Sequence, residues 1–390
     1  MINIVDLFSG AGGLTFGFYY KIKGHKFVRN KKFNFLFANE YNPYACEAFR
    51  LNFPDIPLIG CDIASITPAK LEEHNIQYND VDLVIGGPPC QSYSTVGKRQ
   101  YDQRATMYEE YIRLLGILRP KMFIFENVTG LLSMKNENGE PVINDIKELF
   151  GNIQSADTEL GYVIKQTILN AKDFGVPQSR ERVFLVGTRK DVKDAWVFPQ
   201  ATHGPKKEKD YITISQAISD LPTLDQGETK QVYESGPNTD YEILMRNGSE
   251  ILENHTSGIY GEKMNAVIRA VPQGEGRGYV NSLVEKGLLN KEYYLTSGYN
   301  NTYGRLWWDK PSTTITNSFG TPSALRCIHP LEHRSLTTRE GARLQSFPDW
   351  FKFTGPKHER NSQVGNAVPP LLAIHLAKNI QKCFDNFENG

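Results

Sequence analysis

The first half of the chain alternates short apolar runs with longer segments in which apolar residues recur at helical spacing. The apolar runs predict strands over residues 2–8, 33–38, 81–85, 122–126 and 183–187. The intervening segments predict helices over residues 14–21, 44–51, 107–118 and 143–160. Short apolar strands separated by helices favour an α/β fold whose mostly parallel, doubly wound sheet is covered on both faces. Such sheets bind ligands beyond the carboxyl ends of their strands.

The pattern changes after about residue 190. From 196 to 333 the helical spacing fades, and glycine, proline, aromatic and polar residues dominate, with short β-like pieces such as 312–316. We therefore predict a second, smaller domain of irregular β structure. Helical spacing returns over 337–345 and again over 371–384, where two prolines precede the last helix, as is typical of a helix start.

Composition narrows the class of protein. The chain has 390 residues, of which 39% are hydrophobic and 23% charged, as in ordinary globular proteins. No apolar run is long enough to span a bilayer, and the chain starts almost directly with a predicted strand, so we expect a cytoplasmic protein. The five cysteines are scattered without a C-x-x-C pair, which argues against a disulfide framework and a zinc site. The net charge of zero is a mild argument against a nucleic-acid partner, although local basic patches decide such binding.

The turn after the first strand carries a glycine-rich sequence, "DLFSGAGG", that lets backbone N–H groups approach a ligand. It nearly matches a dinucleotide fingerprint, but Thr15 replaces the third glycine, so a nicotinamide cofactor is disfavoured. The ring of Phe8 could lie flat on an adenine. Glu40 follows the second strand and could accept hydrogen bonds from ribose hydroxyls, and Asp62 follows another short apolar piece. Together these residues favour a nucleoside ligand, although either acid could instead cap a helix or lie in a solvated loop.

The segment "GGPPCQSYS" raises a second chemical possibility, because it ends a predicted buried strand with two glycines and two prolines and then presents Cys90. Such a rigid turn would direct a thiol away from the sheet. The alternative is a surface loop with an inert buried cysteine.

Five motifs occur in one order along the chain: "DLFSGAGGLTFGF", "GGPPCQSYS", "FENV" at 125–128, "QSRER" at 178–182 and "QVGNAVPP" at 363–370. With them the chain resembles the DNA cytosine-5 methyltransferases, most strongly the bacterial single-chain enzymes of restriction–modification systems. The resemblance covers roughly the first half and the last sixth of the chain. It implies a Rossmann-like, S-adenosylmethionine-dependent methyltransferase sheet.

The resemblance implies a set of catalytic residues. Cys90 matches the nucleophile that adds to carbon 6 of cytosine, and Glu126 matches the acid that protonates ring nitrogen 3. For that role Glu126 must hold a proton, so we predict that burial raises its pKa well above the usual value; a purely structural carboxylate would have a lowered pKa. Arg182 matches a contact to the cytosine O2, Arg180 a supporting position near the nucleophile, and Gln178 a structural position.

The resemblance also implies how S-adenosylmethionine is bound. It places the ligand against the Phe8 ring and the turn after it, with Glu40 at the ribose and Asp62 near the adenine. We expect no metal, because the spacing of His255, His329 and His333 fits no usual metal site. The full set of implied cofactor contacts is Phe8, Ser9, Gly10, Gly13, Leu14, Glu40, Tyr41, Asp62, Ile63, Pro89, Asn366 and Val368.

Chemistry on a stacked base requires that the target nucleotide be flipped out of the duplex. The polar segment 91–104 resembles a loop that closes over DNA, and the second domain would read the sequence through the major groove. The implied DNA contacts are Ser94, Lys98, Arg99, Arg104 and Arg305, with Arg269, Arg277 and Arg326 as further candidates. The basic insert over 21–32 could touch DNA or be a solvated loop.

These inferences predict a catalytic domain formed by 1–190 plus 350–390, a target-recognition domain over 191–333 and a connecting motif over 334–349. The expected activity is transfer of a methyl group to carbon 5 of cytosine in duplex DNA, by a monomer that acts beside, but not in a stable complex with, a restriction endonuclease. The main alternative is a transfer-RNA cytosine methyltransferase of the same architecture. A nicotinamide dehydrogenase would share the fold type but has no use for the Pro-Pro-Cys turn. A catalytically inactive DNA-binding paralogue would be expected to lose Cys90 or Glu126, and both are present.

Overall fold

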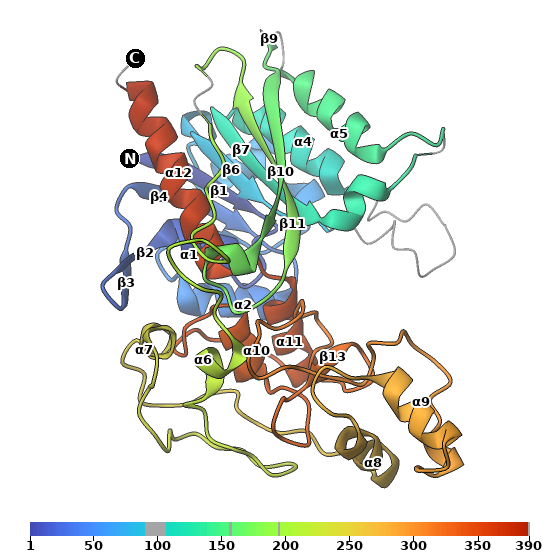
Figure 1. Ribbon diagram of the computed structural model, residues 1–390. Coiled ribbons are helices and arrows are strands. Elements are labelled where there is room, and N and C mark those ends of the chain that lie inside the picture. The colour runs from blue at the N-terminus through green and yellow to red at the C-terminus, as the bar shows by residue number, and fades with distance from the viewer. Residues whose placement is uncertain (90–106, 137, 156–157, 194–195, 389–390) are drawn as a thin grey trace.

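The structure is a computed structural model that describes residues 1–89, 107–136, 138–155, 158–193 and 196–388. Cys90, Ser94, Lys98, Arg99 and Arg104 therefore lie outside the described residues. Figure 1 shows a sheet-containing part at the top and a second part below it that contains α6 to α9. Within the described residues, no helix combines the length and apolar character needed to cross a bilayer.

The upper part is built on a seven-stranded sheet in the order β10-β11-β7-β6-β1-β4-β5. The strand bounds are β1 Ile2–Leu7, β4 Phe33–Asn39, β5 Leu58–Ile59, β6 Leu83–Gly86, β7 Met122–Val128, β10 Tyr162–Asn170 and β11 Glu181–Arg189. β1 pairs in parallel with β4 and β6, β4 with β5, and β6 with β7, whereas β11 runs antiparallel to β7 and β10. The prediction of a mostly parallel sheet is confirmed.

Helices cover both faces of this sheet, as its apolar strands require. On one face, strand residues such as Ile4 and Ile85 share a core with side chains of α1, α2 and α12, while on the other Val5 and Val84 pack with α4 and α5. The helices in this part are α1 Gly13–Tyr19, α2 Pro43–Asn52, α3 Pro68–Glu73, α4 Met107–Leu118, α5 Val142–Gly151 and α12 Pro370–Glu388. The doubly wound arrangement is therefore confirmed.

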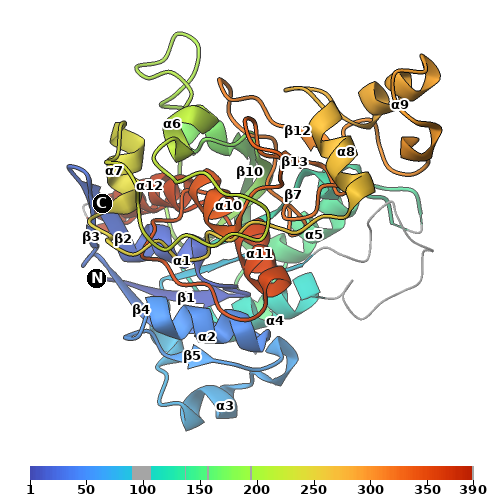
Figure 2. The same ribbon diagram turned by 90° about the horizontal axis from the view of Figure 1, so that it is seen from below.

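Several elements differ from the sequence prediction. The helix expected over 143–160 ends at Gly151, and the antiparallel pair β8 Gln154–Ser155 and β9 Thr158–Glu159 follows it. The 21–32 insert includes a hairpin of β2 Tyr20–Lys23 and β3 Lys26–Arg29. Figures 1 and 2 both show this hairpin on the side of the molecule opposite α8 and α9.

The second part corrects the expectation of a β domain. In the described residues from 197 to 333, the regular structure is mainly helical, and the sheet structure there is the two-stranded sheet of β12 and β13. These elements are α6 Ile214–Ile218, α7 Asp240–Arg246, α8 Glu262–Ala270, α9 Arg277–Glu285, β12 Gly304–Arg305 and β13 Arg326–Ile328. The helices α6 and α7 start with capping boxes at Thr213 and Thr239, a local signal that is easily missed among many polar residues.

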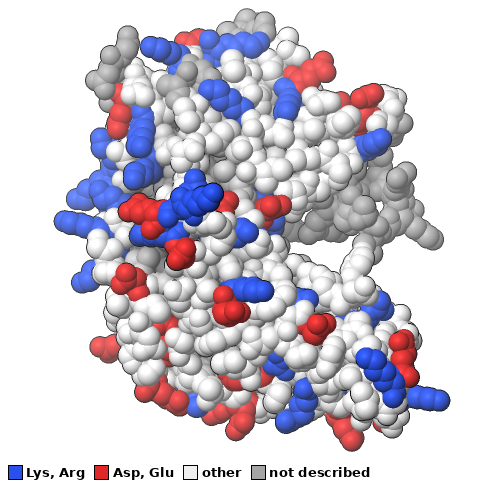
Figure 3. Space-filling model, in the orientation of Figure 1, with Lys and Arg blue, Asp and Glu red and all other residues white. Residues whose placement is uncertain are grey.

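Two helices link the parts: α10 Thr338–Leu344 and α11 Lys357–Asn366. The first begins at a capping box formed by Thr337 and Glu340 and is buried along its whole length. The turn before α11 is tied to the sheet-containing part, because Asn52 Nδ2 donates to the carbonyl of Lys352 at 2.9 Å. Figure 3 shows that the surface is hollowed between the two parts, on the side where α8 and α9 lie.

Candidate active site

The carboxyl ends of the central parallel strands bring the candidate residues to one edge of the sheet. β1 leads into the glycine-rich turn at Phe8, β4 into Glu40, and β6 into the Gly87-Pro88-Pro89 turn. Glu126 lies near the end of β7, the neighbour of β6. This juxtaposition follows from the topology, since parallel neighbours end at the same edge.

The environment of Glu126 favours the protonated form of its carboxyl. The residue is 8% exposed, and desolvation raises the pKa of its carboxyl above the ordinary value, although Arg182 and Arg180 both act to lower it. The direction of the predicted pKa shift is confirmed. A buried carboxyl that stays neutral can donate a proton to a neighbouring base, which an exposed carboxylate at neutral pH cannot.

Both motif arginines lie close to this carboxyl. The Nε atom of Arg182 is 3.1 Å from Oε1 of Glu126. Arg180 is 1% exposed and donates from Nη1 to the carbonyl of Ile315 and from Nη2 to that of Gly365, so it also joins the sheet to the second part. Burial lowers the pKa of Arg180 to about 9 and lowers that of Arg182. The arrangement places positive charge in a poorly solvated region beside Glu126.

Gln178 has the structural position that we expected. It is fully buried and donates from Nε2 to the carbonyl of Leu344 and to Oε1 of Gln345, while its own Oε1 accepts from the N–H of Ile315. Its amide thus joins the start of β11 to two segments that are far away in sequence.

The turn before Cys90 is attached to β7. Asn127 Nδ2 donates to the carbonyl of Pro88 at 3.1 Å, and both residues are buried. A Cβ atom at Gly87 would lie 2.7 Å from Oε2 of Glu126, so only glycine lets the turn pass this close to the carboxyl. Neither Gly87 nor Asn127 was singled out from the sequence, although both belong to the quoted motifs.

The glycine-rich turn forms a second, adjacent cradle. Phe8 has a φ of 57° and Gly10 a φ of 58°, and a Cβ at Gly10 would meet no atom within 4 Å. Glu40 Oε2 accepts from the N–H of Gly10 at 2.8 Å, and its Oε1 accepts from the N–H groups of Tyr41 and Asn42. The half-buried aromatic ring, the open space over Gly10 and a carboxylate fixed by backbone donors fit a nucleoside ligand.

The other expected cofactor contacts are less uniform. Asp62 is exposed and caps a short 3-10 helix, η1 Ile63–Ser65, by accepting from the N–H of Ala64, which is the capping role that the sequence left open for this acid. A Cβ at Gly13 would lie 2.5 Å from the carbonyl oxygen of Val368, so the turn and the C-terminal motif are in contact. Of the remaining expected contacts, Ser9, Leu14, Ile63 and Val368 are buried, whereas Tyr41, Pro89 and Asn366 are exposed.

Asp6 lies beneath this turn and was not singled out from the sequence. It is 1% exposed, and Thr15 Oγ1 donates to its Oδ2, but its Oδ1 has no hydrogen-bond partner among the described residues. Desolvation raises the pKa of Asp6 to about 8, with a further rise from Glu40. The acid is thus held mainly protonated at neutral pH.

Arg305 corrects one expectation. Its side chain is 4% exposed, and the guanidinium donates to the carbonyls of Ile268, Val271, His329 and Glu332 and contacts Nδ1 of His333. Because the protein's own backbone uses these donors, Arg305 is a structural residue and not a DNA contact. Arg269 is exposed and Arg277 and Arg326 are partly exposed, so they remain available to solvent.

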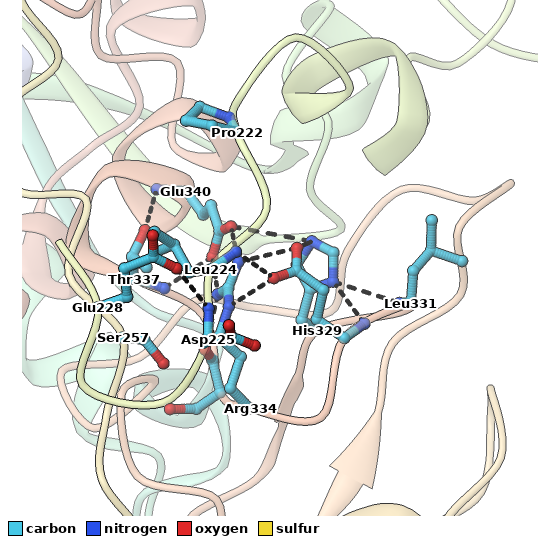
Figure 4. A network of polar contacts seen from close by, with 12 residues as sticks. Pro222, Leu224, Asp225, Glu228, Ser257, His329, Leu331, Arg334, Thr337 and Glu340 are labelled. Atoms are coloured by element: carbon cyan, nitrogen blue, oxygen red, sulfur yellow. Dashed lines mark hydrogen bonds and ion pairs between the residues drawn. The ribbon is translucent and has the colours of Figure 1, made fainter. Parts of the chain in front are cut away.

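His329 lies in an ion-pair network (Figure 4). His329 Nε2, Glu332 and Glu340 present ligand-type atoms within 4.8 Å of one another. The Arg334 guanidinium lies among them and donates to Glu332 at 2.9 and 3.0 Å and to Glu340 at 2.7 and 2.8 Å. Burial lowers the pKa of His329 to about 3, while Arg334 holds the pKa of Glu340 well below its usual range. Both carboxylates therefore bind an arginine that the chain itself supplies.

Comparisons with known proteins identify the family of the chain. The family model of the C-5 cytosine-specific DNA methylases matches residues 2–382. Type II methyltransferase M.DdeI of Desulfomicrobium norvegicum is 36% identical over 401 residues, covering 99% of this chain and 90% of that protein. Type II methyltransferase M1.HphI of Haemophilus parahaemolyticus is 33% identical over 389 residues, covering 99% of this chain and 88% of that protein.

Solved structures support the fold. A protein assigned as a DNA modification methyltransferase, encoded within an Escherichia coli prophage, matches with a TM-score of 0.72 and 24% identity over 99% of this chain and all of that one. DNMT2 of Spodoptera frugiperda matches with a TM-score of 0.60 and 16% identity over 97% of this chain and 99% of that one. Because the family model matches nearly its entire length, the chain belongs to the family of C-5 cytosine-specific DNA methylases.

Proposed function

We propose that this DNA cytosine-5 methyltransferase modifies cytosine within one short duplex sequence, with Cys90 as nucleophile and Glu126 as acid. The observation that carries the residue assignment is the environment of Glu126. Its carboxyl is buried, its pKa is raised, Arg182 lies 3.1 Å away, and Gly87 keeps the Pro-Pro turn directly beside it.

In the proposed chemistry, Cys90 and Glu126 act on two different atoms of the cytosine ring. The Cys90 thiolate forms a bond to carbon 6 while Glu126 transfers its proton to ring nitrogen 3, so that electron density moves to carbon 5. Bound S-adenosylmethionine supplies an electrophilic methyl group and leaves as S-adenosylhomocysteine. Loss of the proton from carbon 5 to water then expels the thiolate, and nitrogen 3 returns its proton to Glu126.

The arginines have supporting roles in this proposal. A free thiol is only a few per cent ionised at neutral pH, so positive charge near the turn favours the thiolate. Arg182, with 14% of its side chain exposed, is suited to contact the polar O2 edge of the base. Arg180 is fixed by Ile315 and Gly365 and acts on the site through its charge.

The cofactor site is proposed at the adjacent cradle. The Phe8 ring would pack on the adenine, the remaining lone pairs of Glu40 would accept from ribose hydroxyls, and the backbone of the Ser9–Gly13 turn would face the rest of the ligand. Val368, in contact with Gly13, would close the site from the C-terminal motif. Leu14, Tyr41, Asp62, Ile63, Pro89 and Asn366 complete the proposed set.

The division of labour between the two parts is also a proposal. Residues 1–190 and 350–390 would form the catalytic domain and 191–333 the target-recognition domain, joined by 334–349. Duplex DNA would occupy the hollow between them, with Ser94, Lys98, Arg99 and Arg104 as contacts, although these lie outside the described residues. We propose a monomeric, cytoplasmic enzyme that protects DNA from a separate restriction endonuclease. The similarity to Type II methyltransferases supports the part of this proposal that concerns DNA methylation.

Bisulfite sequencing of DNA from cells that express the chain tests the activity and reveals the target sequence. The matched variant Cys90→Ser should bind DNA and yield no methylated cytosine. Transfer of labelled methyl to duplex DNA and to transfer RNA should favour DNA strongly. Normal methylation by Cys90→Ser would refute the nucleophile assignment, and a preference for RNA would refute the substrate.

A further inference from the structure

The charge of this chain is neutral overall but uneven along its length. It has 44 acidic and 44 basic side chains, yet no aspartate or glutamate occurs between Asp6 and Glu40. That segment contains Lys21, Lys23, Lys26, Arg29, Lys31 and Lys32. The cations are concentrated on and beside the β2–β3 hairpin, which has no part in the proposed chemistry.

The hairpin has one face for the core and one for solvent. Phe27 is 7% exposed, and its ring packs edge-on against Phe16 at 5.0 Å between centroids. Because side chains alternate along a strand, Lys21 and Lys23 point to the opposite face from Ile22. Lys26, which is paired with Lys23, lies on that same face. The three lysines are exposed and form what we call the lysine face.

This arrangement costs stability unless an anion is present. Lys23 and Lys26 are directly opposite each other across the strands, and like charges in such a pair repel. Among the described residues, no carboxylate forms an ion pair with Lys21, Lys23 or Lys26. Arg29 differs, since its guanidinium lies 3.8 Å over the Tyr19 ring and donates to backbone carbonyls, which anchors the hairpin.

The basic surface extends beyond the hairpin to α12. Lys32 lies 3.8 Å from Asp385 of that helix, where Lys378 and Lys382 are exposed one turn apart. Figure 3 shows lysine and arginine side chains along the margin of the upper part, over β2, β3 and α12. In Figures 1 and 2 this margin lies opposite α8 and α9, and thus away from the hollow between the two parts.

From this geometry we infer that the lysine face binds the phosphate backbone of duplex DNA outside the catalytic cleft. Lysine ammonium groups are point charges that bind phosphates without reading the base sequence. Duplex DNA carries about one negative charge per 1.7 Å of axis, so a row of exposed lysines can follow it. The inference rests on the proposed duplex substrate, because that polyanion is the one this enzyme must find and travel along.

A membrane surface fits the lysine face less well. Proteins that lie on anionic bilayers combine lysine with buried tryptophan, phenylalanine or leucine, whereas the large apolar side chain exposed on the described hairpin is Ile22, at 40%. Lysines also protect strand edges from aggregation, and that role would require no DNA. The experiment must therefore separate phosphate binding from solubility.

The test is the salt dependence of binding to a long duplex of mixed sequence. The full-length triple variant Lys21→Gln, Lys23→Gln, Lys26→Gln should bind more weakly than wild type, and the slope of log K against log salt should fall in magnitude by about 2 to 3. Methyl transfer at low salt and saturating DNA should stay within about twofold of wild type, since the catalytic residues are untouched.

The matched control also removes three positive charges, through Lys70→Gln, Lys147→Gln and Lys193→Gln. These lysines lie in the sheet-containing part but outside the lysine face. The salt slope of this control should equal that of wild type. The inference would be overturned if the lysine-face variant kept the wild-type slope, if the control lost as much slope, or if the variant aggregated without a change in slope. It would also be overturned if the wild-type protein bound anionic vesicles in preference to duplex DNA. Failure of wild type to bind duplex at all would refute the proposed substrate instead.

Discussion

Arg182 and Glu126 form an ion pair, with 3.1 Å between Nε and Oε1, in a place where the pKa of the acid is nevertheless raised. Two opposing effects meet here. Burial disfavours the charged carboxylate, whereas Arg182 and Arg180 stabilise it, and burial is the larger effect. Burial thus favours the protonated form of Glu126, and Arg182 lies where it can stabilise the anion that remains after the proton is given away.

The first prediction concerns that proton. Glu126→Gln keeps the shape of the side chain and removes the transferable proton, so kcat should fall by roughly 10²–10⁴-fold. Methyl transfer from labelled S-adenosylmethionine measures the loss, with DNA binding and thermal unfolding as controls for folding. Activity close to wild type would show that another group protonates the base.

The second prediction concerns pH. Since the acid must be protonated, the rate should decline as the pH rises through the raised pKa of Glu126. Arg182 acts to lower that pKa, so Arg182→Gln should move the alkaline decline to higher pH even though it also reduces kcat. The pH dependence of kcat/KM for both enzymes checks the direction. A shift to lower pH would mean that Glu126 is not the group that titrates.

The third prediction uses the close approach of the turn to the acid. In Gly87→Ala the new Cβ would lie 2.7 Å from Oε2 of Glu126, the mobile end of a side chain. The carboxyl can rotate away at little cost in stability, so activity should fall about 10- to 100-fold with only a small change in melting temperature.

A control and a double variant make the third prediction specific. Gly130→Ala, whose Cβ would have only an ordinary contact at 3.9 Å, should be close to wild type. Gly87→Ala should add little to the defect of Glu126→Gln, because both act through the same proton. Additive losses would indicate that Gly87 serves the thiol turn rather than Glu126.

The sequence predicted the central sheet well because its parallel strands are nearly continuous apolar runs. It missed β10, whose residues Tyr162–Asn170 are mostly half-exposed and whose apolar pattern is correspondingly weak. It also indicated β structure for the second part, since α6 to α9 are short and their apolar faces small.

At the site, the family resemblance identified Glu126, and the role that it implies predicted the rise in the pKa of that acid. Arg305 shows the limit of such reasoning. An arginine in a polar segment suggests a nucleic-acid contact, and only the fold reveals the backbone carbonyls that it binds. Gly87 is a similar case, because its closeness to Glu126 depends on the pairing of β6 with β7.

The fourth prediction concerns the cofactor cradle. Glu40→Gln replaces one carboxylate oxygen with an amide donor that would face the N–H of Gly10 or those of Tyr41 and Asn42. The turn should loosen, and the dissociation constant for S-adenosylmethionine, measured by calorimetry, should rise at least about tenfold. Asp62→Asn keeps an acceptor for the Ala64 N–H and should have the smaller effect. The reverse ranking would move the ribose contact to Asp62.

The fifth prediction concerns Asp6 and stability. Its pKa is about 8 in the folded chain against 3.8 for an ordinary aspartate, so the native state holds the proton over a range where the unfolded state has lost it. Its contribution to stability is therefore fully present below about pH 4 and is lost as the pH rises through 8, at up to roughly 1.4 kcal/mol per pH unit. Asp6→Asn keeps a neutral group in place and should unfold at higher urea than wild type at pH 9, with a smaller difference at pH 5. If the difference in urea midpoint between the two proteins is the same across this pH range, Asp6 is ionised in the folded chain. Its Oδ1 would then have a partner that the described residues do not supply.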